Sequence, residues 1–444
     1  MATDLLRALQ AVGMPAAEAG ALAERVRACA AGESAPRRWR QMVLDALSPA
    51  LPFPVQRAVF EHVYGDWPSA AGPAPAWVPA EDACLRANLG VLMRHLGMPS
   101  YAALQRWSVT HRDAFWELAI QHLGIRFAQP PTAIRGGDDP RAPQWLPGAR
   151  LNIAASCFQA DPARPAVLFQ APGGSAEVTT YGELDALSNR VANGLVALGF
   201  KPGDAAAIAM PMTTAAIAVY LGVVKAGCVA VAIADQFSEE EIARRLRLGR
   251  VRGVVVQQVS GHGAEGVHDK LVAVSAPPMV VMPEHPGGRA DLRPGDVAWS
   301  GFLSGSAHFV PVPMPPDAAI NVLFSSGTTR EPKAIPWTHT TPIRCAVDAW
   351  LHHDVHPDDI LAWPTSLAWM MGPWLIYAAL VNQACLAIYG GHPISRSFGQ
   401  FVQDAGVTML GVVPTLVRSW RHSACMEGLD WRRVRRFSST GECS

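Results

Sequence analysis

A polar segment in the second half of the chain has the residue types that bind phosphate groups. Residues 321–339 read NVLFSSGTTREPKAIPWTH, so a strand is expected to end in hydroxyls, a glycine and, slightly later, a lysine. A polyphosphate needs such groups, because each of its oxygens accepts a hydrogen bond and its charge requires a cation. SGTT alone is also typical of an ordinary turn, but the proline and lysine that follow favour phosphate. The candidate residues of this surface loop are Ser325, Ser326, Gly327, Thr328, Thr329 and Lys333.

The elements that must position this loop alternate between helix and strand. Thr180 and Glu183 have capping-box spacing at the start of an apolar helical pattern that continues to Gly199. The apolar strands and short connections that follow suit a parallel sheet covered on both faces. The alternation resumes with NVLF, ILAW, CLAIY and TMLGV, so we expect two α/β layers joined by a long connection. The elements expected after the first helix are strands over residues 205–210, 228–234 and 253–258 and helices over residues 213–226 and from Ser238.

Composition excludes several classes of protein. The 444 residues are 50% hydrophobic and 17% charged, which is typical of a chain with large buried cores and not of a disordered one. Lys plus Arg and Asp plus Glu both number 37, so no net field attracts nucleic acid or an anionic membrane. Residues 205–234 carry only one charge, at Lys225, but Pro211 and Gly227 divide them into pieces too short for a membrane span.

The N-terminal part differs from the rest of the chain. Its pattern is helical at first, and six prolines between Pro52 and Pro79 then predict a linker. Helix breakers over residues 128–148 predict a second boundary. We therefore expect a helical extension over residues 1–75, a lead-in over residues 76–150 and a main α/β domain over residues 151–444. The eight cysteines stand singly and no secretory signal is visible, which favours a reducing, intracellular location.

Three motifs, read together, resemble those of the adenylate-forming enzymes, the superfamily of AMP-binding proteins that includes acyl-CoA synthetases. These motifs are SSGTTREPK, TTYGELDALSNRVANGLVALGFKPGDAAAIAMP and KAGCVAV. RWSVTHRDAFWELA and WLPGARLNIAASCF are similar to the lead-in of acetyl-CoA-synthetase-type enzymes, and the nearest likeness is to plant-type acyl-activating enzymes, often peroxisomal. The resemblance implies the large domain of this family, with layered parallel sheets, behind a helical extension of about 150 residues.

The resemblance also implies an activity and its residues. Family members use ATP and Mg²⁺ to convert a carboxylic acid into an acyl-adenylate and then transfer the acyl group to CoA. Thr328, Thr329 and Lys333 would hold the β- and γ-phosphates, with Thr328 and Lys333 as the catalytic pair. WPTSLAWMMGPWLIY, GVVPTLVRSW and FSSTGE are similar to the acyl-pocket, PT-R and adenine-contacting segments. The residues carried over from them are Trp369, Met371 and Gly372 for the acyl pocket and Gly441 and Glu442 for adenine; for Trp369, plain core packing is an equal alternative.

Two departures from the family pattern bear on function. Arg330 stands where the phosphate loop usually has a second glycine. The chain stops at Ser444, so the resemblance predicts a C-terminally truncated member without the family's magnesium motif or small domain, and hence weak adenine binding and no acyl-CoA formation by these residues alone. Whether such a truncation is biological stays open. The alternative function is an inactive or nucleotide-binding remnant that acts through protein contacts; the acid and the oligomeric state are not indicated.

Three other motifs have ordinary explanations. GHGAEG at residues 261–266 follows a strand like a dinucleotide fingerprint, but too few residues follow it for the required helix. His352, His353 and His356 precede Pro357 in an expected loop, which favours a solvated turn over a metal site. WRRVRRF at residues 431–437 is basic, but its alternation predicts a solvated terminal strand and not a nucleic-acid surface. No metal-binding residue is predicted.

Overall fold

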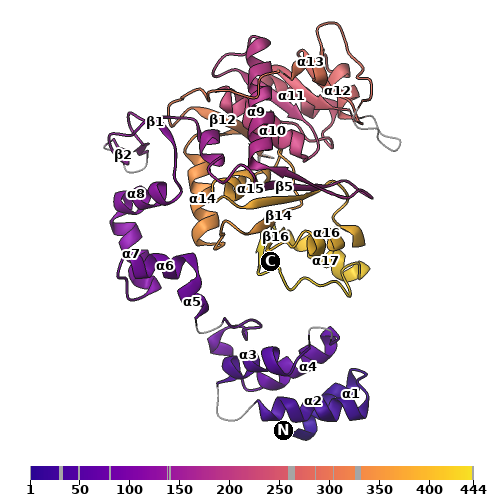
Figure 1. Cartoon of the computed structure of the whole chain (residues 1–444). Helices are drawn as coiled ribbons and strands as arrows, with labels where there is room; N and C mark the ends of the chain where they lie inside the picture. The colour runs from indigo at the N-terminus through magenta and orange to yellow at the C-terminus, as the bar shows by residue number, and fades with distance from the viewer. Residues whose placement is uncertain are drawn as a thin grey trace. The chain divides into compact units, whose positions relative to one another are not determined.

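The described residues of the computed structural model form two compact units, Met1–Gly97 and Met98–Ser444 (Figure 1). The structure describes residues 2–29, 34–48, 51–79, 82–137, 139, 142–258, 266–285, 287–303, 305–325 and 332–442.

The first unit is helical, as its sequence predicts. Apolar residues at helical spacing meet in one core, where Leu9, Leu22 and Val59 are fully buried. Trp39 packs against this core edge-on to Phe60, at a ring-centroid distance of 5.1 Å. The helices are α1 (Ala2–Ala11), α2 (Ala16–Ala28), α3 (Ala35–Asp45), α4 (Phe53–Val63), α5 (Ala83–Arg86) and α6 (Asn88–His95).

Helix α4 occupies part of the stretch in which prolines predict a linker. Pro52 is its N-cap and Pro54 lies in its first turn. A proline is tolerated there, because the first amides of a helix have no intrahelical acceptor and the fixed φ angle suits the helix start. The prediction of a linker is therefore wrong over α4.

The second unit begins with a lead-in of two helices and two short strand pairs. Asn152 ties the end of this lead-in to the main domain, because its side-chain amide donates to Val224 O at 2.8 Å and to Val312 O at 2.9 Å. The elements of the lead-in are α7 (Tyr101–Thr110), α8 (Arg112–His122), β1 (Phe127–Gln129), β2 (Arg135–Gly136), β3 (Gln144–Trp145), β4 (Arg150–Leu151) and a 3-10 helix over Ile153–Cys157.

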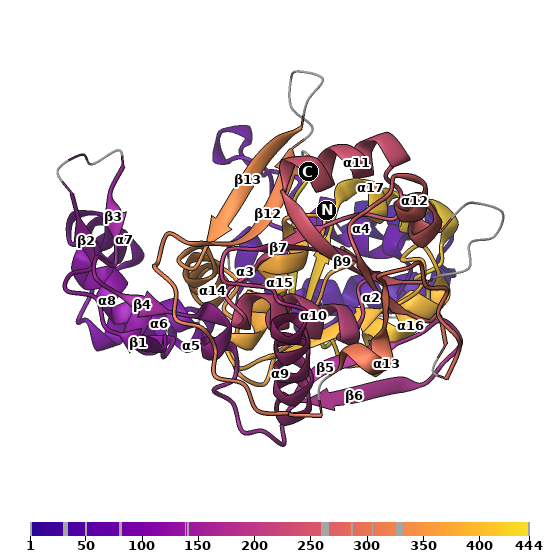
Figure 2. The same ribbon diagram turned by 90° about the horizontal axis from the view of Figure 1, so that it is seen from above.

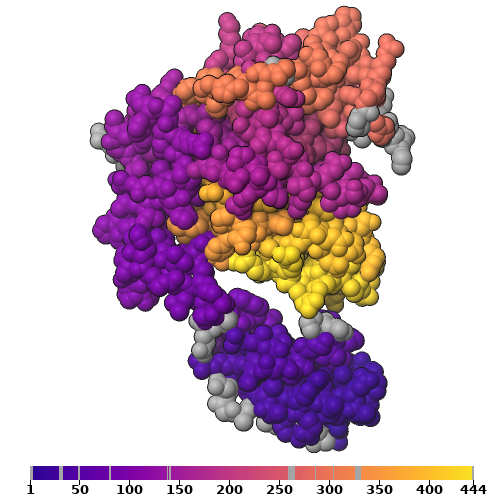
Figure 3. Space-filling view, in the orientation of Figure 1, coloured from indigo at the N-terminus to yellow at the C-terminus, as the bar shows by residue number. Residues whose placement is uncertain are grey.

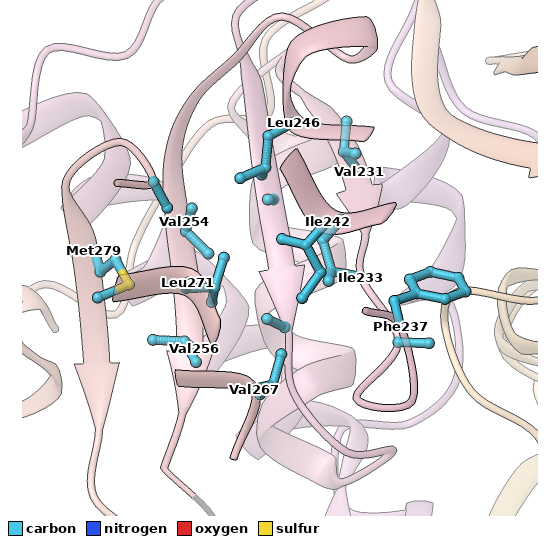
Figure 4. Close-up of a cluster of buried hydrophobic side chains, with 14 of the residues drawn as sticks. Val231, Ile233, Phe237, Ile242, Leu246, Val254, Val256, Val267, Leu271 and Met279 are labelled. Carbon is cyan, nitrogen blue, oxygen red and sulfur yellow. The ribbon is translucent and has the colours of Figure 1, made fainter. Parts of the chain in front are cut away.

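A first main sheet has, in the described ranges, seven strands in the order β11-β10-β9-β7-β8-β12-β13. All neighbours are parallel except β12 and β13. Val254, Leu271 and Met279 belong to the apolar core between this sheet and helices α11 and α12 (Figure 4). The elements are β7 (Ala205–Ala209), β8 (Val229–Ala232), α11 (Glu239–Leu248), β9 (Val251–Gln257), α12 (Val267–Ala273), β10 (Met279–Met282), β11 (Val297–Ala298), α13 (Trp299–Phe302), β12 (Ala319–Ser325) and β13 (Lys333–Thr338).

A second main sheet has, within the described residues, six strands in the order β17-β16-β14-β15-β5-β6. Only β6 runs antiparallel to its neighbour. The apolar cluster on one face includes Phe401 and Trp420 of helices α16 and α17. The elements are β5 (Pro165–Gln170), β6 (Ala176–Thr180), α14 (Thr341–Leu351), β14 (Ile360–Ala362), β15 (Cys385–Tyr389), α16 (Arg396–Asp404), β16 (Met409–Val412), α17 (Pro414–Ser423) and β17 (Arg436–Ser439).

The assignment of strands to sheets differs in one respect from the sequence prediction. The NVLF strand is β12, and it joins the first sheet beside β8 instead of starting the second. Hydrophobic alternation identifies a strand but not its partner, because pairing depends on residues far away in the sequence. The α/β fold with layered parallel sheets is confirmed.

Helices α10 (Thr214–Lys225) and α15 (Met371–Leu380) lie between the two sheets (Figure 1). Tyr220 of α10 and Tyr377 of α15 meet edge to face at a ring-centroid distance of 5.9 Å. Helix α9 (Tyr181–Ala197) runs beside α10 in both ribbon views, and the predicted capping box of Thr180 and Glu183 starts it (Figure 1 and Figure 2). The two sheets are thus joined by a packed helical layer.

The apolar run at residues 205–234 forms β7, α10 and β8, as its proline and glycine predict. In the part of the chain that the structure describes, no helix has both the length and the apolar character to cross a bilayer.

Candidate active site

One pocket collects residues from the carboxyl ends of strands in both main sheets. Ligands of open α/β folds bind at this edge of the strands, because the loops that leave them are free to vary. The pocket has a volume of about 470 Å³. Its lining residues follow β8, β14, β16 and β17 or lead into α15, and they are Ala234, Asp235, Gln236, Trp363, Pro364, Thr365, Ser366, Trp369, Met370, Met371, Val413, Thr440 and Gly441.

Two residues predicted for an acyl pocket, Trp369 and Met371, line this pocket. The Trp369 side chain is 48% exposed, so it forms an open wall and is not a core residue. Its indole meets the Phe237 ring edge-on at a centroid distance of 6.4 Å. The structure therefore places Trp369 where an apolar ligand could contact it.

Gly372 is buried just inside α15. A Cβ atom at this position would come within 2.2 Å of Ser366 O, so only glycine lets the helix start against that carbonyl. The position of Gly372 supports the course of the 363–371 segment, whose side chains form the pocket wall.

The two residues predicted for adenine have different surroundings. Gly441 lines the pocket with a φ of +85°, a conformation that favours glycine. The Glu442 carboxylate instead contacts the start of α17, where Oε2 accepts from Thr415 N at 3.1 Å and lies 3.0 Å from Arg418 Nη2. The Thr415 hydroxyl also donates to it, and this hydrogen bond, with Arg418 nearby, lowers the pKa of Glu442. Glu442 therefore ties the Gly441 turn to the PT-R segment.

The predicted phosphate loop is described only at its ends. Ser325 ends β12 and Lys333 starts β13, and the two residues are register partners in this antiparallel pair. Ser326, Gly327, Thr328, Thr329 and Arg330 lie outside the described residues.

The register of β12 relates the start of this loop to the pocket. Asn321 pairs with Ala230 and Val322 with Val231. Continued along both strands, this register brings Ser325 level with Ala234, which lines the pocket. The start of the phosphate loop and the pocket thus share one edge of the first sheet.

One histidine and two arginines hold strand β17 in place. His353 Nε2 lies 2.8 Å from Ser438 Oγ, and burial lowers the pKa of His353. Arg435 pairs with Asp359 and Arg436 with Asp354. Their strand β17 is an edge strand of the second sheet as described, as the sequence predicts, and the C-terminal residues lie at the surface of the second unit (Figure 3).

Sequence reasoning did not single out Asp235, Gln236 or Trp363 as site residues. Asp235 and Gln236 follow a predicted parallel strand, and this position alone was a usable signal. Trp363 is 7% exposed and lies over Gly411 of β16, where a Cβ would come within 1.8 Å of its ring. A glycine in a strand interior is a signal of such close approach, but the sequence does not show which side chain approaches.

Layered parallel sheets with a pocket at their carboxyl edges define an α/β fold of the kind that binds ligands at this edge. The family model for AMP-binding enzymes matches residues 155–442, and that for the acetyl-coenzyme A synthetase N-terminus matches residues 101–157. The chain therefore belongs to the AMP-binding enzyme family, and the resemblance seen in its motifs is confirmed.

Known proteins similar to this chain include plant and bacterial acyl-activating enzymes. It is 38% identical to hexanoyl-CoA synthase of Cannabis sativa, covering 96% of this chain and 62% of that protein. It is also 38% identical to probable acyl-activating enzyme 17, peroxisomal, of Arabidopsis thaliana, covering 92% and 60%. Acetoacetyl-CoA synthetase from Streptomyces lividans has a similar structure, with a TM-score of 0.76, 26% identity and coverage of 83% and 60%. The chain spans about three fifths of the length of these relatives.

Proposed function

We propose that this chain carries the ATP site and the acid site of an AMP-forming acyl-CoA synthetase. The observation that supports this most directly is that Trp369, Met371 and Gly441 line the same pocket. A pocket with an apolar wall beside a glycine turn suits a ligand in which an apolar tail lies next to a nucleotide. The name of the similar hexanoyl-CoA synthase supports an acid with an apolar tail as the substrate class.

The proposed reaction has two steps. A carboxylate oxygen attacks the α-phosphorus of ATP, an O–P bond forms, and the bond to the bridging oxygen breaks so that pyrophosphate leaves. The CoA thiolate then attacks the acyl carbon of the adenylate, and AMP leaves. Neither step needs a covalent enzyme intermediate, so the protein contributes positioning and charge stabilisation.

The roles proposed for this chain's residues follow from that chemistry. Lys333 and the hydroxyls of Thr328 and Thr329 bind the phosphates that leave, and Thr328 and Lys333 stabilise the charge that develops on them. The Gly441 turn, held by Glu442, receives the adenine. Trp369, Met371 and Gly372 form and shape the acid site.

Mg²⁺ chemistry is not assigned to any residue of this chain. Mg²⁺ in such enzymes is held by one or two carboxylates together with substrate phosphates. Among the residues that the structure describes, no group of three or more His, Cys, Asp or Glu side chains could hold a metal ion. Since Mg²⁺ needs fewer side chains than such a group, the absence of one from the described residues neither supplies nor excludes a site, and no step is derived through the ion.

The test is ATP binding by isothermal titration calorimetry, followed by pyrophosphate release with a panel of short to long carboxylic acids. We expect wild type to bind ATP and Lys333→Met to bind it at least about tenfold more weakly, a loss of about 1.4 kcal/mol. Lys201→Met, at an exposed lysine in the turn before β7, is the matched control. ATP binding without pyrophosphate release for any acid favours the nucleotide-binding remnant, and no ATP binding contradicts the proposal.

We extend the proposal to location. Two similar Arabidopsis thaliana proteins are named as peroxisomal, which supports a peroxisomal or cytoplasmic site for this chain. Fluorescence microscopy of the tagged protein with a peroxisomal marker tests it, and secretion to the medium would contradict it.

A further inference from the structure

Arg245 of α11 is a buried arginine whose guanidinium lies over two aromatic rings. The residue is 8% exposed, and its guanidinium carbon lies 3.7 Å from the Phe237 ring centroid and 5.7 Å from that of Phe324. Its Nη1 donates to Glu241 O at 3.0 Å, and Glu241 Oε1 is 3.6 Å from the same atom. The planar guanidinium is suited to such stacking, which the ammonium of lysine cannot reproduce.

The contacts of Arg245 with Glu241 explain only part of its burial. Its Nε is buried and has no hydrogen-bond partner among the described atoms. Burial also lowers the pKa of Arg245, while the neighbouring Glu241 carboxylate acts in the opposite direction. Since an apolar side chain of similar length would fill the same space without this cost, the contacts with the two rings are the evident contribution of Arg245.

The two rings belong to different parts of the candidate site. Phe324 directly precedes Ser325, the first residue of the phosphate loop, on β12. Phe237 follows Asp235 and Gln236 of the pocket wall, and its ring is 6.4 Å from that of Trp369. Arg245 thus contacts Phe324, the residue before the phosphate loop, and is linked through the Phe237 ring to Trp369 of the pocket.

The turn that carries Phe237 is also fixed from a second side. Lys270 of α12 donates to Asp235 O at 2.9 Å and to Phe237 O at 3.1 Å. Phe237 belongs to the apolar core of the first sheet (Figure 4). Phe324 and Ala368, the neighbour of Trp369, pack against that core. With its backbone held by Lys270, the Phe237 ring can transmit a shift of Phe324 to Trp369.

We propose that Arg245 is a positioning residue that couples the phosphate loop to the acid site through Phe324 and Phe237. The inference rests on the proposed function, because it assumes that ATP and an acid bind at these two places. Arg245 acts through the rings it stacks on. Binding of the nucleotide orders Phe324, and Arg245 passes this order to Phe237 and Trp369, so that the acid binds more tightly once the nucleotide is present.

The experiment measures this coupling directly. Hexanoate affinity is measured by Trp fluorescence with and without α,β-methylene ATP, whose α-phosphate cannot lose pyrophosphate. We expect the analogue to strengthen hexanoate binding in wild type by about tenfold, or about 1.4 kcal/mol. In Arg245→Lys and Arg245→Met the ratio of hexanoate affinity with the analogue to that without it should fall to about one. Arg245→Met should nevertheless keep the wild-type midpoint of urea unfolding.

Control variants separate this coupling from folding. Arg244→Met removes the neighbouring arginine, which pairs with Glu240 at 2.6 Å, and it should keep the wild-type ratio. Should both Arg245 variants fail to fold, Phe324→Leu removes one ring and should by itself reduce the affinity ratio to about one. A wild-type ratio in either Arg245 variant or in Phe324→Leu overturns the inference, as does a wild type without coupling.

The two proposals fail in different ways. A wild type that does not bind the nucleotide analogue contradicts the proposed function and this inference with it. A wild type that binds both ligands, with variants that keep the coupling, contradicts only the role of Arg245.

Discussion

The carboxylate of Glu442 accepts a hydrogen bond from the backbone amide of Thr415 at 3.1 Å, and so it caps helix α17. An anion at this end of a helix is favoured by the free amides and the helix dipole. The contact joins two segments that the sequence presents separately, the PT-R segment and the Gly441 turn. Glu442 therefore ties the Gly441 turn, which lines the pocket, to the start of α17.

We predict that Glu442→Gln weakens the contact between the Gly441 turn and the start of α17. The hydrogen bond from the Thr415 hydroxyl lowers the pKa of Glu442. The stability that the ionised carboxylate contributes is therefore present above the ordinary pKa of a glutamate and is lost as the pH falls through the lowered value. The protection of the amides of residues 413–442 against hydrogen exchange, measured relative to the intrinsic exchange rate at each pH, should be weaker in the variant at pH 7, and acidification should weaken it in wild type only. Glu427→Gln is the control, and equal exchange in wild type and Glu442→Gln would contradict the prediction.

A second prediction concerns the pH dependence of stability. His339 is buried and accepts a hydrogen bond from Ile153 N at Nδ1, 3.1 Å away, and burial lowers the pKa of His339 to about 4. The unfolded chain takes up a proton near pH 6.5 while the folded chain does not, so stability is full above pH 6.5 and falls by up to about 3 kcal/mol towards pH 4. Urea unfolding should show a smaller loss in His339→Gln, and equal losses in the two proteins would refute this.

Lys225 provides a third prediction. It is 1% exposed, and its ammonium donates to Asp185 Oδ1 at 2.5 Å, Ser188 Oγ at 2.7 Å and Asn189 Oδ1 at 2.7 Å. Lys225→Met leaves these groups without their donor and should cost about 3 kcal/mol, the low end for a broken buried pair, because Asp185 stays partly hydrated. The measurement is the free energy of unfolding in urea. Lys201→Met should be neutral, and an unchanged Lys225→Met would show that the cluster does not stabilise the fold.

Gly411→Ala should disturb the acid site. The added Cβ would meet the Trp363 ring at 1.8 Å and push the indole towards the pocket that it lines. We expect a loss of about 1–3 kcal/mol from overpacking, together with weaker hexanoate binding measured by calorimetry. Gly301→Ala is the matched control. Outside its chain neighbours and its own helix backbone, the nearest atom to an added Cβ there is Val297 Cγ1, 4.0 Å away. Wild-type affinity in Gly411→Ala would mean that Trp363 does not shape the site.

Local sequence signals were enough for most of the main fold. Thr180 with Glu183 and Ser238 with Glu241 predict two helix starts, and both capping boxes are present. The predicted strands agree with β7, β8 and β9 to within a few residues. The sheet that receives β12 could not be predicted, because its partner β8 lies about 90 residues earlier and no local pattern specifies the pair.

For the candidate site, motif resemblance indicates residues but not their contacts. Trp369, Met371 and Gly441 are identified by motif resemblance, and the structure brings them to one pocket. The cap that Glu442 forms on Thr415 depends on how two distant segments meet, which a motif does not encode. The phosphate-binding roles of Thr328 and Thr329 stay predictions, because these residues lie outside the described part of the chain.

The second sheet has a consequence for how the chain folds during synthesis. Its strand β5 pairs with β15, with Leu168 opposite Ala387, so more than two hundred residues must leave the ribosome between the two partners. The whole first sheet lies in that interval and can form first. Until β15 emerges, β5 has only its hairpin partner β6 and keeps one open edge. Slow, non-local pairing of this kind exposes a nascent chain to aggregation, so we expect this chain to depend on chaperones that bind it before release.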